Sequence, residues 1–511
     1  QEIYMKFDNI VIVGGGSAGW MTASTLIKTF PNKNITLVES PNQPVVGVGE
    51  STTQLMRRWQ NYLEIPDIDF LTKCNATNKL SIRFENFHKN DKIGFHYPFG
   101  RIDERSYTVA QWFIYQHFSQ VPFENFVNDL SPINYCIEEN KVPTESFPSG
   151  WDLEKDAAWH FDTHKFYGYL RDEYCKPKGV KHILADVNNA VTDECGFITK
   201  VMTDKGNIEG DLFFDCTGFK RLLIEGVLKE PWREFNNKTY TNNAWAAARP
   251  YKDKYNELKL YTNSVALDYG WVWEIPTWER IGTGYNYCDD YISKEDALTE
   301  FKNYLGPVAQ EMDFKHIKMR NGMSERMWVK NCISIGLSGA FIEPLESNGL
   351  MSVHEFLLQF VNVTHNKTKL NNFDAQTFNH NCREQFLYFA DFITLHYAMT
   401  SRDDNRYWQD IQQQNFNDSM LLKQVYEVIG CPYYELEDRL NWDSFGAVLY
   451  MLAGHKINPF NKFKKINGDF WQDFVGKDTI NLNHTTEKVH REKLRITNSF
   501  PKSVDYYKKF H

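Results

Sequence analysis

The chain has 511 residues, of which 42% are hydrophobic and 15% aromatic, and its formal net charge is -9 at pH 7. The length predicts more than one lobe, and the acidic balance argues against a nucleic-acid binder, which would present a basic face. No apolar run is long enough to cross a membrane, and nine cysteines without a CxxC pair or Cys/His cluster argue against a disulfide framework and a metal site.

The first predicted element is a nucleotide-binding turn. A buried strand at 10–13 leads into G-G-G-S-A-G at 14–19, a helix is expected over 20–28, and a strand from 34 ends in an acid at 39. Glycines let a pyrophosphate approach the helix N-terminus, and the acid accepts a hydrogen bond from a ribose hydroxyl. This order predicts FAD or NAD rather than NADP. The expected contacts come from Gly14, Gly16, Ser17, Ala18, Gly19 and Glu39.

Two short segments follow. Residues 46–52, V-G-V-G-E-S-T, form a glycine-rich turn leading into a helix, with Ser51 or Thr52 as its N-cap. Lys79 begins an alternating, strand-like stretch over 79–84, where a lysine is ordinarily a solvated charge at a sheet edge. From the residues alone, plain structural roles remain open for both segments.

Residues 271–276 read W-V-W-E-I-P. Residues two apart in a strand point to the same face, so Trp271 and Trp273 are expected to stand side by side. Pro276 is expected to end the pairing along that strand. Spacing alone leaves core packing and a functional wall equally open.

Residues 338–350, S-G-A-F-I-E-P-L-E-S-N-G-L, form a polar turn followed by an apolar helix over 351–360. Backbone amides at such a turn and helix start can form an anion pocket, close to the carboxylate of Glu346. An ordinary loop with Ser347 as a cap is the simpler alternative.

Residues 365–511 are predicted to be mainly helical. Within them, 381–399 carries Phe386, Phe389, Ala390, Ile393 and Tyr397 at three-to-four spacing. This stripe favours a buried core rather than a cofactor wall, and His396 beside it is expected to be an interior histidine.

Taken together, these motifs resemble those of flavin-dependent halogenases of the tryptophan-halogenase family, and of its marine viral branch. The resemblance rests on G-x-G-x-x-G at 14–19, G-x-G-E-S-T at 47–52, A-T-x-K-L at 76–80, W-x-W-x-I-P at 271–276 and E-P-L-E-S at 343–347. The segments 158–162, 395–397 and 401–403 also look familiar. The matches run in order from about residue 8 to 410.

The resemblance implies an α/β, FAD-binding Rossmann-like fold of the flavoprotein-monooxygenase and halogenase type, with a mainly helical C-terminal substrate lobe. The FAD lobe would comprise 5–100 and 155–360, and the substrate lobe 101–154 and 365–511. An N-terminal fingerprint favours FAD in large flavoproteins, and D-x-x-G at 215–218 is similar to their second FAD-contacting segment. The resemblance adds Gly49, Asp215, Gly218 and Leu337 to the FAD contacts. No second glycine fingerprint is present for a nicotinamide cofactor, so FADH2 would come from a separate reductase.

The implied reaction consumes FADH2, O2 and a halide. In this family a flavin hydroperoxide oxidises the halide to hypohalous acid, which travels through a tunnel to a small aromatic substrate. Lys79 would deliver it, Glu346 would act as base, and Ser347 would position its neighbours. The halide would bind amides of Asn348 and Gly349, although the family commonly has Thr at the first position. Residues assigned to the tunnel and substrate are Glu50, Tyr97, Phe99, Trp271, Trp273 and Trp442.

The sequence departs from the tryptophan-specific pattern. Those relatives have His-x-Phe-Gly where this chain has Tyr97-Pro98-Phe99-Gly100, and their C-terminal box for the amino-acid group has no convincing counterpart over 431–442. We therefore expect an indole or phenol without the zwitterion rather than free tryptophan. The alternatives are a flavin-dependent aromatic hydroxylase and a flavin-binding protein without turnover. We expect a cytoplasmic location (host cytoplasm if viral) and no membrane or nucleic-acid partner, and leave a homo-oligomer open.

Overall fold

The computed structural model describes residues 5–42, 47, 49–236, 238–413, 419–430, 435, 439–440, 446–461 and 483–511, and the backbone of 462, 463 and 468–482. The chain forms two compact units. The first comprises Gln1–Ala76, His160–Ala244 and His316–Ala390, and the second Thr77–Trp159, Trp245–Lys315 and Asp391–His511. The predicted FAD and substrate lobes are defined by what they bind, whereas these units are defined by their internal contacts. The division into two binding lobes therefore stays a prediction.

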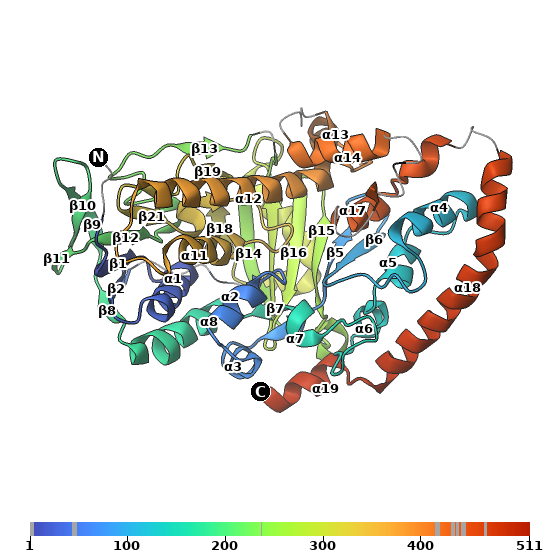
Figure 1. The fold of residues 1–511 in the computed structure, drawn as a ribbon, viewed down its shortest axis with the longest axis horizontal. Helices are drawn as coiled ribbons and strands as arrows, with labels where there is room; N and C mark the ends of the chain where they lie inside the picture. The colour runs from blue at the N-terminus through green and yellow to red at the C-terminus, as the bar shows by residue number, and fades with distance from the viewer. Residues whose placement is uncertain are drawn as a thin grey trace. The chain divides into compact units, whose positions relative to one another are not determined.

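A six-stranded sheet forms the centre of the first unit, in the order β20-β21-β12-β1-β2-β8 (Figure 1). All neighbours pair in parallel except β20 and β21. The strands are β1 (Asn9–Val13), β2 (Asn34–Glu39), β8 (Lys181–Leu184), β12 (Leu212–Asp215), β20 (Trp328–Val329) and β21 (Cys332–Ser334). Apolar runs buried on both faces build such sheets, and the strands predicted at 10–13 and from 34 are confirmed.

Helix α1 (Ser17–Thr29) follows β1, which confirms the helix predicted over 20–28. The helix predicted over 351–360 is also confirmed, as α11 (Met351–Thr364). Other helices of this unit are α2 (Met56–Tyr62), α3 (Asp67–Lys73), α8 (Thr163–Tyr169) and the first part of α12 (Asn372–Ala398). Its small sheets contain β9 (Val187–Thr192), β10 (Ile198–Thr203), β11 (Gly206–Glu209), β13 (Trp232–Glu234), β19 (Gly322–Ser324) and β22 (Ala340–Phe341).

The predicted helix cap at Ser51 or Thr52 is wrong. Glu50–Ser51 forms a short strand, β3, that pairs with β7 (Ala158–Phe161) through Phe161 and His160. Helix α2 begins only at Met56, and its N-cap is Leu55. The backbone of Ser51 takes part in sheet pairing, and its side chain makes a contact outside the helix start.

The second unit is built on a sheet in which β14-β17-β16-β15-β5-β6 are neighbours. The strands are β5 (Ser81–Glu85), β6 (Gly94–Pro98), β14 (Asn243–Arg249), β15 (Tyr261–Ala266), β16 (Gly270–Pro276) and β17 (Ile281–Tyr287). A separate short strand, β4 (Thr77–Lys79), precedes β5. The helices are α4 (Val109–Ser119), α5 (Asn125–Leu130), α6 (Asn134–Glu139), α7 (Leu153–Asp156), α9 (Lys254–Glu257), α10 (Lys294–Leu305), α13 (Arg406–Gln412), α14 (Met420–Gly430), α17 (Val448–Gly454), α18 (Gly468–Ser499) and α19 (Ser503–Tyr507).

Where the structure describes residues 365–511, they are mainly helical, as predicted. Four of the five residues in the predicted stripe on α12 are buried: Phe386, Ala390, Ile393 and Tyr397. Among the described residues, no helix is both long and apolar enough to traverse a lipid bilayer.

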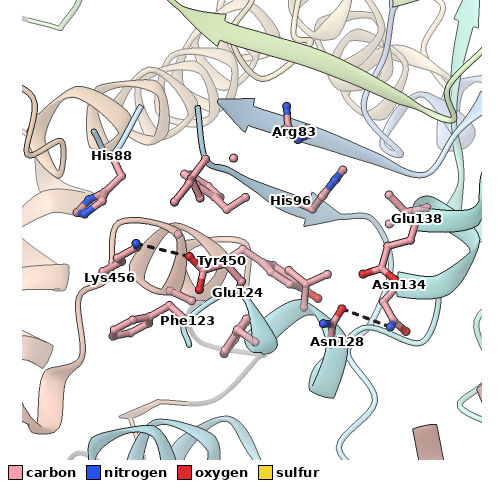
Figure 2. A pocket seen from close by; sticks show the side chains of 18 of the residues that line it. Arg83, His88, His96, Phe123, Glu124, Asn128, Asn134, Glu138, Tyr450 and Lys456 are labelled. Atoms are coloured by element: carbon pink, nitrogen blue, oxygen red, sulfur yellow. Dashed lines mark hydrogen bonds and ion pairs between the residues drawn. The ribbon is translucent and has the colours of Figure 1, made fainter. Parts of the chain in front are cut away.

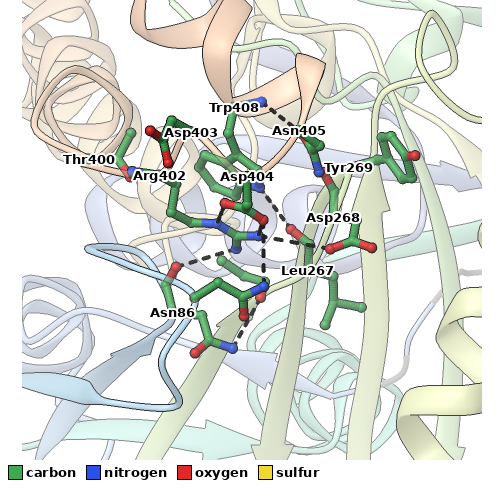
Figure 3. Close-up of polar contacts among 12 residues, drawn as sticks. Asn86, Leu267, Asp268, Tyr269, Thr400, Arg402, Asp403, Asp404, Asn405 and Trp408 are labelled. Carbon is green, nitrogen blue, oxygen red and sulfur yellow. Dashed lines mark hydrogen bonds and ion pairs between the residues drawn. The ribbon is translucent and has the colours of Figure 1, made fainter.

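A buried arginine ties the segment after α12 to the loop after β5. Arg402 donates to Asp404 through Nε (2.9 Å) and Nη2 (2.6 Å), and through Nη1 to the carbonyl of Asn86 (3.3 Å) (Figure 3). Its guanidinium also lies 4.3 Å from the ring centre of Trp408. A planar guanidinium satisfies several acceptors at once while stacking on an indole, so this one side chain joins segments that are distant in sequence.

Buried histidines form a second feature of this unit. His396 packs on Phe84, with ring centroids 4.3 Å apart, and neither ring nitrogen of His455 has a hydrogen-bond partner among the described residues. Burial lowers the pKa of His96 and of His396 to about 3, and lowers that of His455 well below its usual value. The prediction that His396 is an interior histidine is confirmed.

We expect Arg402→Met to destabilise the protein by about 2–4 kcal/mol, because removing one partner of a buried ion pair strands the other groups. Urea unfolding followed by circular dichroism measures the loss. The matched control is Arg406→Met, which removes an 86% exposed side chain paired with Asp410 and should cost under about 0.5 kcal/mol. Equal midpoints for the two variants would contradict the structural role.

The buried histidines predict acid-sensitive stability. Their folded pKa values lie below the unfolded value near 6.5, so the unfolded state binds more protons and stability falls as the pH drops below 6.5. Each fully buried histidine should contribute about 1.4 kcal/mol per pH unit between about pH 6 and its folded pKa. Unfolding free energies at pH 7.5 and 5.5 should differ less in His396→Leu than in wild type, whereas the exposed-site variant His380→Gln should match wild type.

Candidate functional site

The glycine fingerprint surrounds a cavity of about 380 Å³ at the carboxyl ends of the parallel strands in the first unit. In open α/β sheets, this edge is where nucleotides bind. The cavity is lined by Val13, Gly14, Gly15, Gly16, Val38, Glu39, Ser40, Ala185, Asp186, Val187, Cys216, Thr217, Lys220 and Leu222.

Two of the glycines are required by close packing. A side chain at Gly14, whose φ is +120°, would come within 2.2 Å of the Cys216 carbonyl oxygen, and one at Gly19 within 1.8 Å of the Gly14 carbonyl oxygen. Gly16 differs, since no described atom lies within 4 Å of a Cβ placed there. Its bare backbone therefore faces open space where a phosphate can approach.

This cradle fits the adenosine diphosphate half of FAD. Helix α1 has no side-chain cap at its N-terminus, and the buried hydroxyl of Ser17 in its first turn has no hydrogen-bond partner among the described residues. Both features suit a phosphate group that accepts hydrogen bonds at a helix start. The Glu39 carboxylate lines the cavity and lies 2.7 Å from Nε2 of His182, with lone pairs remaining for a ribose hydroxyl.

Asp215 does not line this cavity. Its carboxylate is buried, and accepts hydrogen bonds from the amides of Thr217 (3.0 Å), Leu223 (2.8 Å) and Ile224 (2.8 Å). Asp215 thus holds the turn that places Thr217 at the cavity wall. Gly218 follows with φ +66°, as the predicted D-x-x-G turn requires.

Sequence reasoning missed several residues of the cavity wall: Ser40, Asp186, Thr217 and Lys220. Ser40 and Asp186 are hydrogen-bonded to each other and follow the ends of β2 and β8. The carboxyl ends of neighbouring parallel strands meet at one edge of a sheet. Residues that directly follow β2 and β8 can therefore be placed at this edge once both strands are recognised in the sequence. The strand at 181–184 is half-exposed and carries no apolar run to reveal it.

A second polar turn approaches helix α1 in the same unit. Leu337 belongs to a short 3-10 helix, Gly336–Ser338, and a Cβ added at Gly336 would lie 3.0 Å from that of Ala18. The Ser338 hydroxyl donates to the Asp215 carbonyl. This packing connects the glycine cradle to the chain that leads into the Glu346 turn.

The Glu346 turn, residues 343–349, is mostly buried. Glu346 is 1% exposed, and Ser347 and Asn348 are each 4% exposed. Ser347 adopts φ +59°, a conformation that costs a non-glycine residue free energy and is maintained only by surrounding contacts. The Ser51 hydroxyl donates to that of Ser347 at 3.1 Å, so the simple capping role is wrong, and α11 instead has Leu350 as its N-cap.

Asn348 and Gly349 end the turn. The Asn348 side chain donates to the Ile342 carbonyl at 3.2 Å, while its own side-chain oxygen has no hydrogen-bond partner among the described residues. Glu50 lies beside this segment, because a Cβ added at Gly349 would be 3.7 Å from the carboxylate oxygen Oε2 of Glu50. Glu50 keeps partial solvent exposure, but protein atoms enclose its carboxyl group, and this burial raises its pKa to about 7.

Lys79, in the second unit, is fully buried. The expectation of a solvated charge is wrong, because all three residues of β4 are buried. The Lys79 ammonium lies 4.9 Å from the ring centre of Phe99, close enough for a cation–π interaction. An ammonium placed on an aromatic face in the protein interior is suited to holding a small polar molecule.

Trp271 and Trp273 project from the same face of β16, as predicted, with ring centroids 6.2 Å apart. Trp271 is 1% exposed, and its indole N–H has no hydrogen-bond partner among the described residues. Trp273 covers Gly284 on β17, where a Cβ would come within 2.1 Å of the indole ring. The strand ends at Pro276, again as predicted.

Tyr97 and Phe99 form an edge-to-face pair, with ring centroids 5.4 Å apart. The Tyr97 ring also contacts Tyr450, at 5.7 Å. Trp442, which we predicted to contact the substrate, lies outside the described residues, as does most of the segment 431–442.

A separate cavity of about 240 Å³ lies next to β6 in the second unit (Figure 2). Phe95, Phe126 and Tyr450 form part of its wall, with Arg83, His96 and Glu138 among the polar residues. None of the predicted site residues lines it. In the wall of this cavity, Nζ of Lys456 lies 3.5 Å from Oε1 of Glu124, so these two charges neutralise one another.

Comparison with known proteins assigns the chain to a family. The sequence model described as "Tryptophan halogenase" matches residues 9–459. The tryptophan 6-halogenase ThaL of Streptomyces albogriseolus is 31% identical, over 89% of this chain and 91% of that protein. The VirX1 apo structure has a TM-score of 0.89 at 30% identity, covering 99% of both chains. The tryptophan 6-halogenase SttH of Streptomyces toxytricini has a TM-score of 0.85 at 29% identity, covering 99% of this chain and 100% of that one.

The predicted Rossmann-like halogenase fold is confirmed by these similarities. With a glycine cradle that fits FAD and a sequence match over most of its length, this chain belongs to the tryptophan halogenase family and is a flavin-dependent halogenase.

Proposed function

We propose that this enzyme halogenates an electron-rich, indole- or phenol-type arene and is not restricted to free tryptophan. The balanced reaction takes up arene, halide, O2, FADH2 and a proton, and gives halogenated arene, FAD and two waters. Bound reduced flavin and O2 supply the oxidising power that converts halide to hypohalous acid. The observation that carries the proposal is the buried Glu346 turn, whose strained Ser347 is hydrogen-bonded to Ser51.

The chain's own residues would hold the FAD. The amides of Gly16 and Ser17 at the start of α1 would bind its pyrophosphate, and Glu39 its ribose. Gly49, Gly218 and Leu337 remain proposed contacts. The Asp215 contribution would be indirect, through the turn that its carboxylate holds.

The halide would bind at the backbone N–H groups of Asn348 and Gly349. The amide of Met351 beyond them donates to the Asn348 carbonyl, which orients the turn. Because backbone amides carry the interaction, an asparagine at position 348 is compatible with it.

Lys79 would hold and orient hypohalous acid through its ammonium group. Desolvation strengthens hydrogen bonds from a buried cation, and the side chain is fully buried. The oxygen of hypohalous acid would accept a hydrogen bond from Nζ, leaving the halogen end as the electrophile. That polarisation directs attack by the arene carbon onto halogen.

Glu346 would complete the substitution. Attack by the arene carbon on halogen forms a C–X bond and a cationic ring, and the O–X bond breaks as the Lys79 ammonium gives a proton to the departing oxygen, so that water leaves. Proton exchange with solvent then returns Lys79 to its ammonium form. A carboxylate stabilises that cation and accepts the ring proton. Burial of Glu346 makes its charge more effective than it would be in water, and Ser347 would hold the turn in place.

Trp271 and Trp273 would act as a partition. Two indoles on one face of a strand form a wall that a small arene cannot pass, so substrate and flavin stay apart and only the small oxidant crosses. Their removal would favour direct oxygenation, whereas Lys79 and Glu346 perform the halogenation.

The substrate class follows from the ring residues. Relatives such as ThaL are named tryptophan 6-halogenases, but this chain has Tyr97 where the tryptophan-specific pattern has histidine. Tyr97 and Phe99 would stack on a neutral ring. An arene with a hydroxyl or N–H group and no zwitterion suits them.

We expect brominated product when the enzyme is supplied with FAD, a flavin reductase with NADH, bromide, and indole or a phenol, because bromide is then oxidised to the reactive species. Mass spectrometry detects the paired bromine isotopes, and free tryptophan in the same panel should react at least about tenfold more slowly. Hydroxylated product without bromine would instead establish the aromatic hydroxylase alternative, and faster bromination of tryptophan would refute the substrate class.

Lys79→Ala and Glu346→Gln should each lower kcat for halogenation by about 100-fold or more, because each removes a group that acts on the reacting atoms. FAD binding, measured by fluorescence quenching, should be unchanged. Lys89→Ala and Glu311→Gln change exposed residues of the same types and serve as controls. A flavin-binding protein without turnover would show no difference among the four variants.

The affinity for halide should depend on Glu50. Its pKa of about 7 means that the carboxyl group is neutral at lower pH and negative above, where it opposes an anion at the adjacent Gly349. We expect the KM for bromide to rise by about tenfold between pH 6 and 8.5. In Glu50→Gln this rise should be absent, and an equal rise in both proteins would show that another group is responsible.

A further inference from the structure

The C-terminal tail, residues 499–511, lies beyond the 9–459 region that matches the family, yet it is firmly attached to the second unit. Ser503 in α19 is fully buried; its amide donates to the Asn140 carbonyl at 2.9 Å and its hydroxyl to the Leu258 carbonyl at 2.9 Å. The Val142 amide donates to the Pro501 carbonyl at 3.0 Å. These contacts fix the position of α19.

At the end of α19, the buried hydroxyl of Tyr507 is hydrogen-bonded twice to one residue. It accepts from the backbone N–H of Asn78 at 2.8 Å and donates to the Asn78 side-chain oxygen at 2.9 Å. Asn78 is 1% exposed, and its side-chain nitrogen has no partner among the described residues. Tyr507 therefore satisfies both the amide and the side-chain oxygen of the residue immediately before Lys79.

Three further hydrogen bonds hold the short strand that carries Lys79. The Thr77 hydroxyl donates to the Pro276 carbonyl at 3.1 Å, at the end of the tryptophan strand β16. The Leu80 amide donates to the Leu260 carbonyl at 2.6 Å, and the Phe99 amide to the Leu80 carbonyl at 2.8 Å. The residues on both sides of Lys79 are thus fixed, Leu80 by Leu260 and Phe99 and Asn78 by Tyr507.

We propose that Tyr507 is a positioning residue for Lys79. By holding Asn78 it fixes the Lys79 Cα, and with it the point from which the long side chain reaches its target. This inference rests on the proposed role of Lys79 in delivering hypohalous acid. It extends the functional machinery into a C-terminal helix that no sequence motif marks.

Loss of the Tyr507 hydroxyl leaves a buried amide and a buried carbonyl oxygen without partners, so β4 shifts to find new ones. A displacement of about 1 Å at a reacting group is enough to slow a reaction by one to two orders of magnitude. Halide oxidation does not need Lys79, so hypohalous acid continues to form and a larger share escapes into solution.

The experiment compares Tyr507→Phe with wild type, using indole and bromide, with methionine added to trap escaped oxidant as its sulfoxide. We expect kcat for bromoindole to fall about tenfold with the KM for indole unchanged within twofold, while sulfoxide formation rises. Tyr255→Phe is the matched control: it removes a hydroxyl that donates to Asp505 of the same helix at 2.7 Å, but from a 56% exposed side chain, and should behave as wild type.

Asn78→Ala provides an independent variant, and should give the same shift from bromoindole to sulfoxide. The double variant should be no worse than either single variant, since both act through one contact. Equal product ratios in Tyr507→Phe and Tyr255→Phe would overturn the inference. A parallel loss of bromoindole and sulfoxide would also overturn it, because that result indicates general damage.

Lys79→Ala, measured beside them, separates this inference from the proposed function. If Lys79→Ala no longer forms bromoindole but still forms methionine sulfoxide, the delivery role of Lys79 stands. The result for Tyr507→Phe then decides the positioning role on its own. If Lys79→Ala keeps the wild-type ratio, the delivery role is wrong and the positioning role is overturned with it.

Discussion

The close approach of helix α1 to strand β1 is the constraint on which the first unit depends. It is possible only because Gly19 has no side chain, since a Cβ there would lie 1.8 Å from the Gly14 carbonyl oxygen. Gly14 in turn lets the chain after β12 come close, since a Cβ at Gly14 would lie 2.2 Å from the Cys216 carbonyl oxygen. The same approach leaves the backbone at Gly16 bare and the helix start uncapped. Space for a phosphate is therefore a consequence of how the helix packs.

That packing extends to the Glu346 turn. Gly336 packs against Ala18, and Ser338 is hydrogen-bonded to the Asp215 carbonyl, so the chain leaves the nucleotide cradle in a fixed direction. The turn itself is stabilised by the Ser51–Ser347 contact, which holds a residue with positive φ. In the second unit, β4 is fixed in a comparable way by buried hydrogen bonds at Thr77 and Asn78. Both proposed catalytic side chains thus stand on short, buried segments whose neighbours determine their geometry.

Much of the fold could be predicted from the sequence. The apolar runs at 10–13 and 34–38 and the glycines between them identify strand, turn and helix, because each signal is local. Side-by-side tryptophans and the strand end at Pro276 also follow from local geometry. The family resemblance was carried by motifs of this kind, and the match over residues 9–459 bears it out.

Contacts between distant segments could not be predicted in this way. The pattern around Lys79 is that of an edge charge, because the contacts that hold its strand, from Thr77 to Pro276 and from Asn78 to Tyr507, come from residues far away in the sequence. Ser51 appeared to be a helix cap because its partner, Ser347, lies 296 residues away. The C-terminal fifty residues carried no recognisable pattern, yet they supply the hydroxyl that holds Asn78.

The central claim is that this chain transfers halogen, and not oxygen, to an arene. Incubating the enzyme with reductase, NADH, bromide, indole and 18O2, and recording the product mass spectrum, tests it most directly. The account predicts a product with the paired bromine isotopes and no 18O, because both oxygen atoms leave as water. A product that gains 18O and lacks bromine would contradict it.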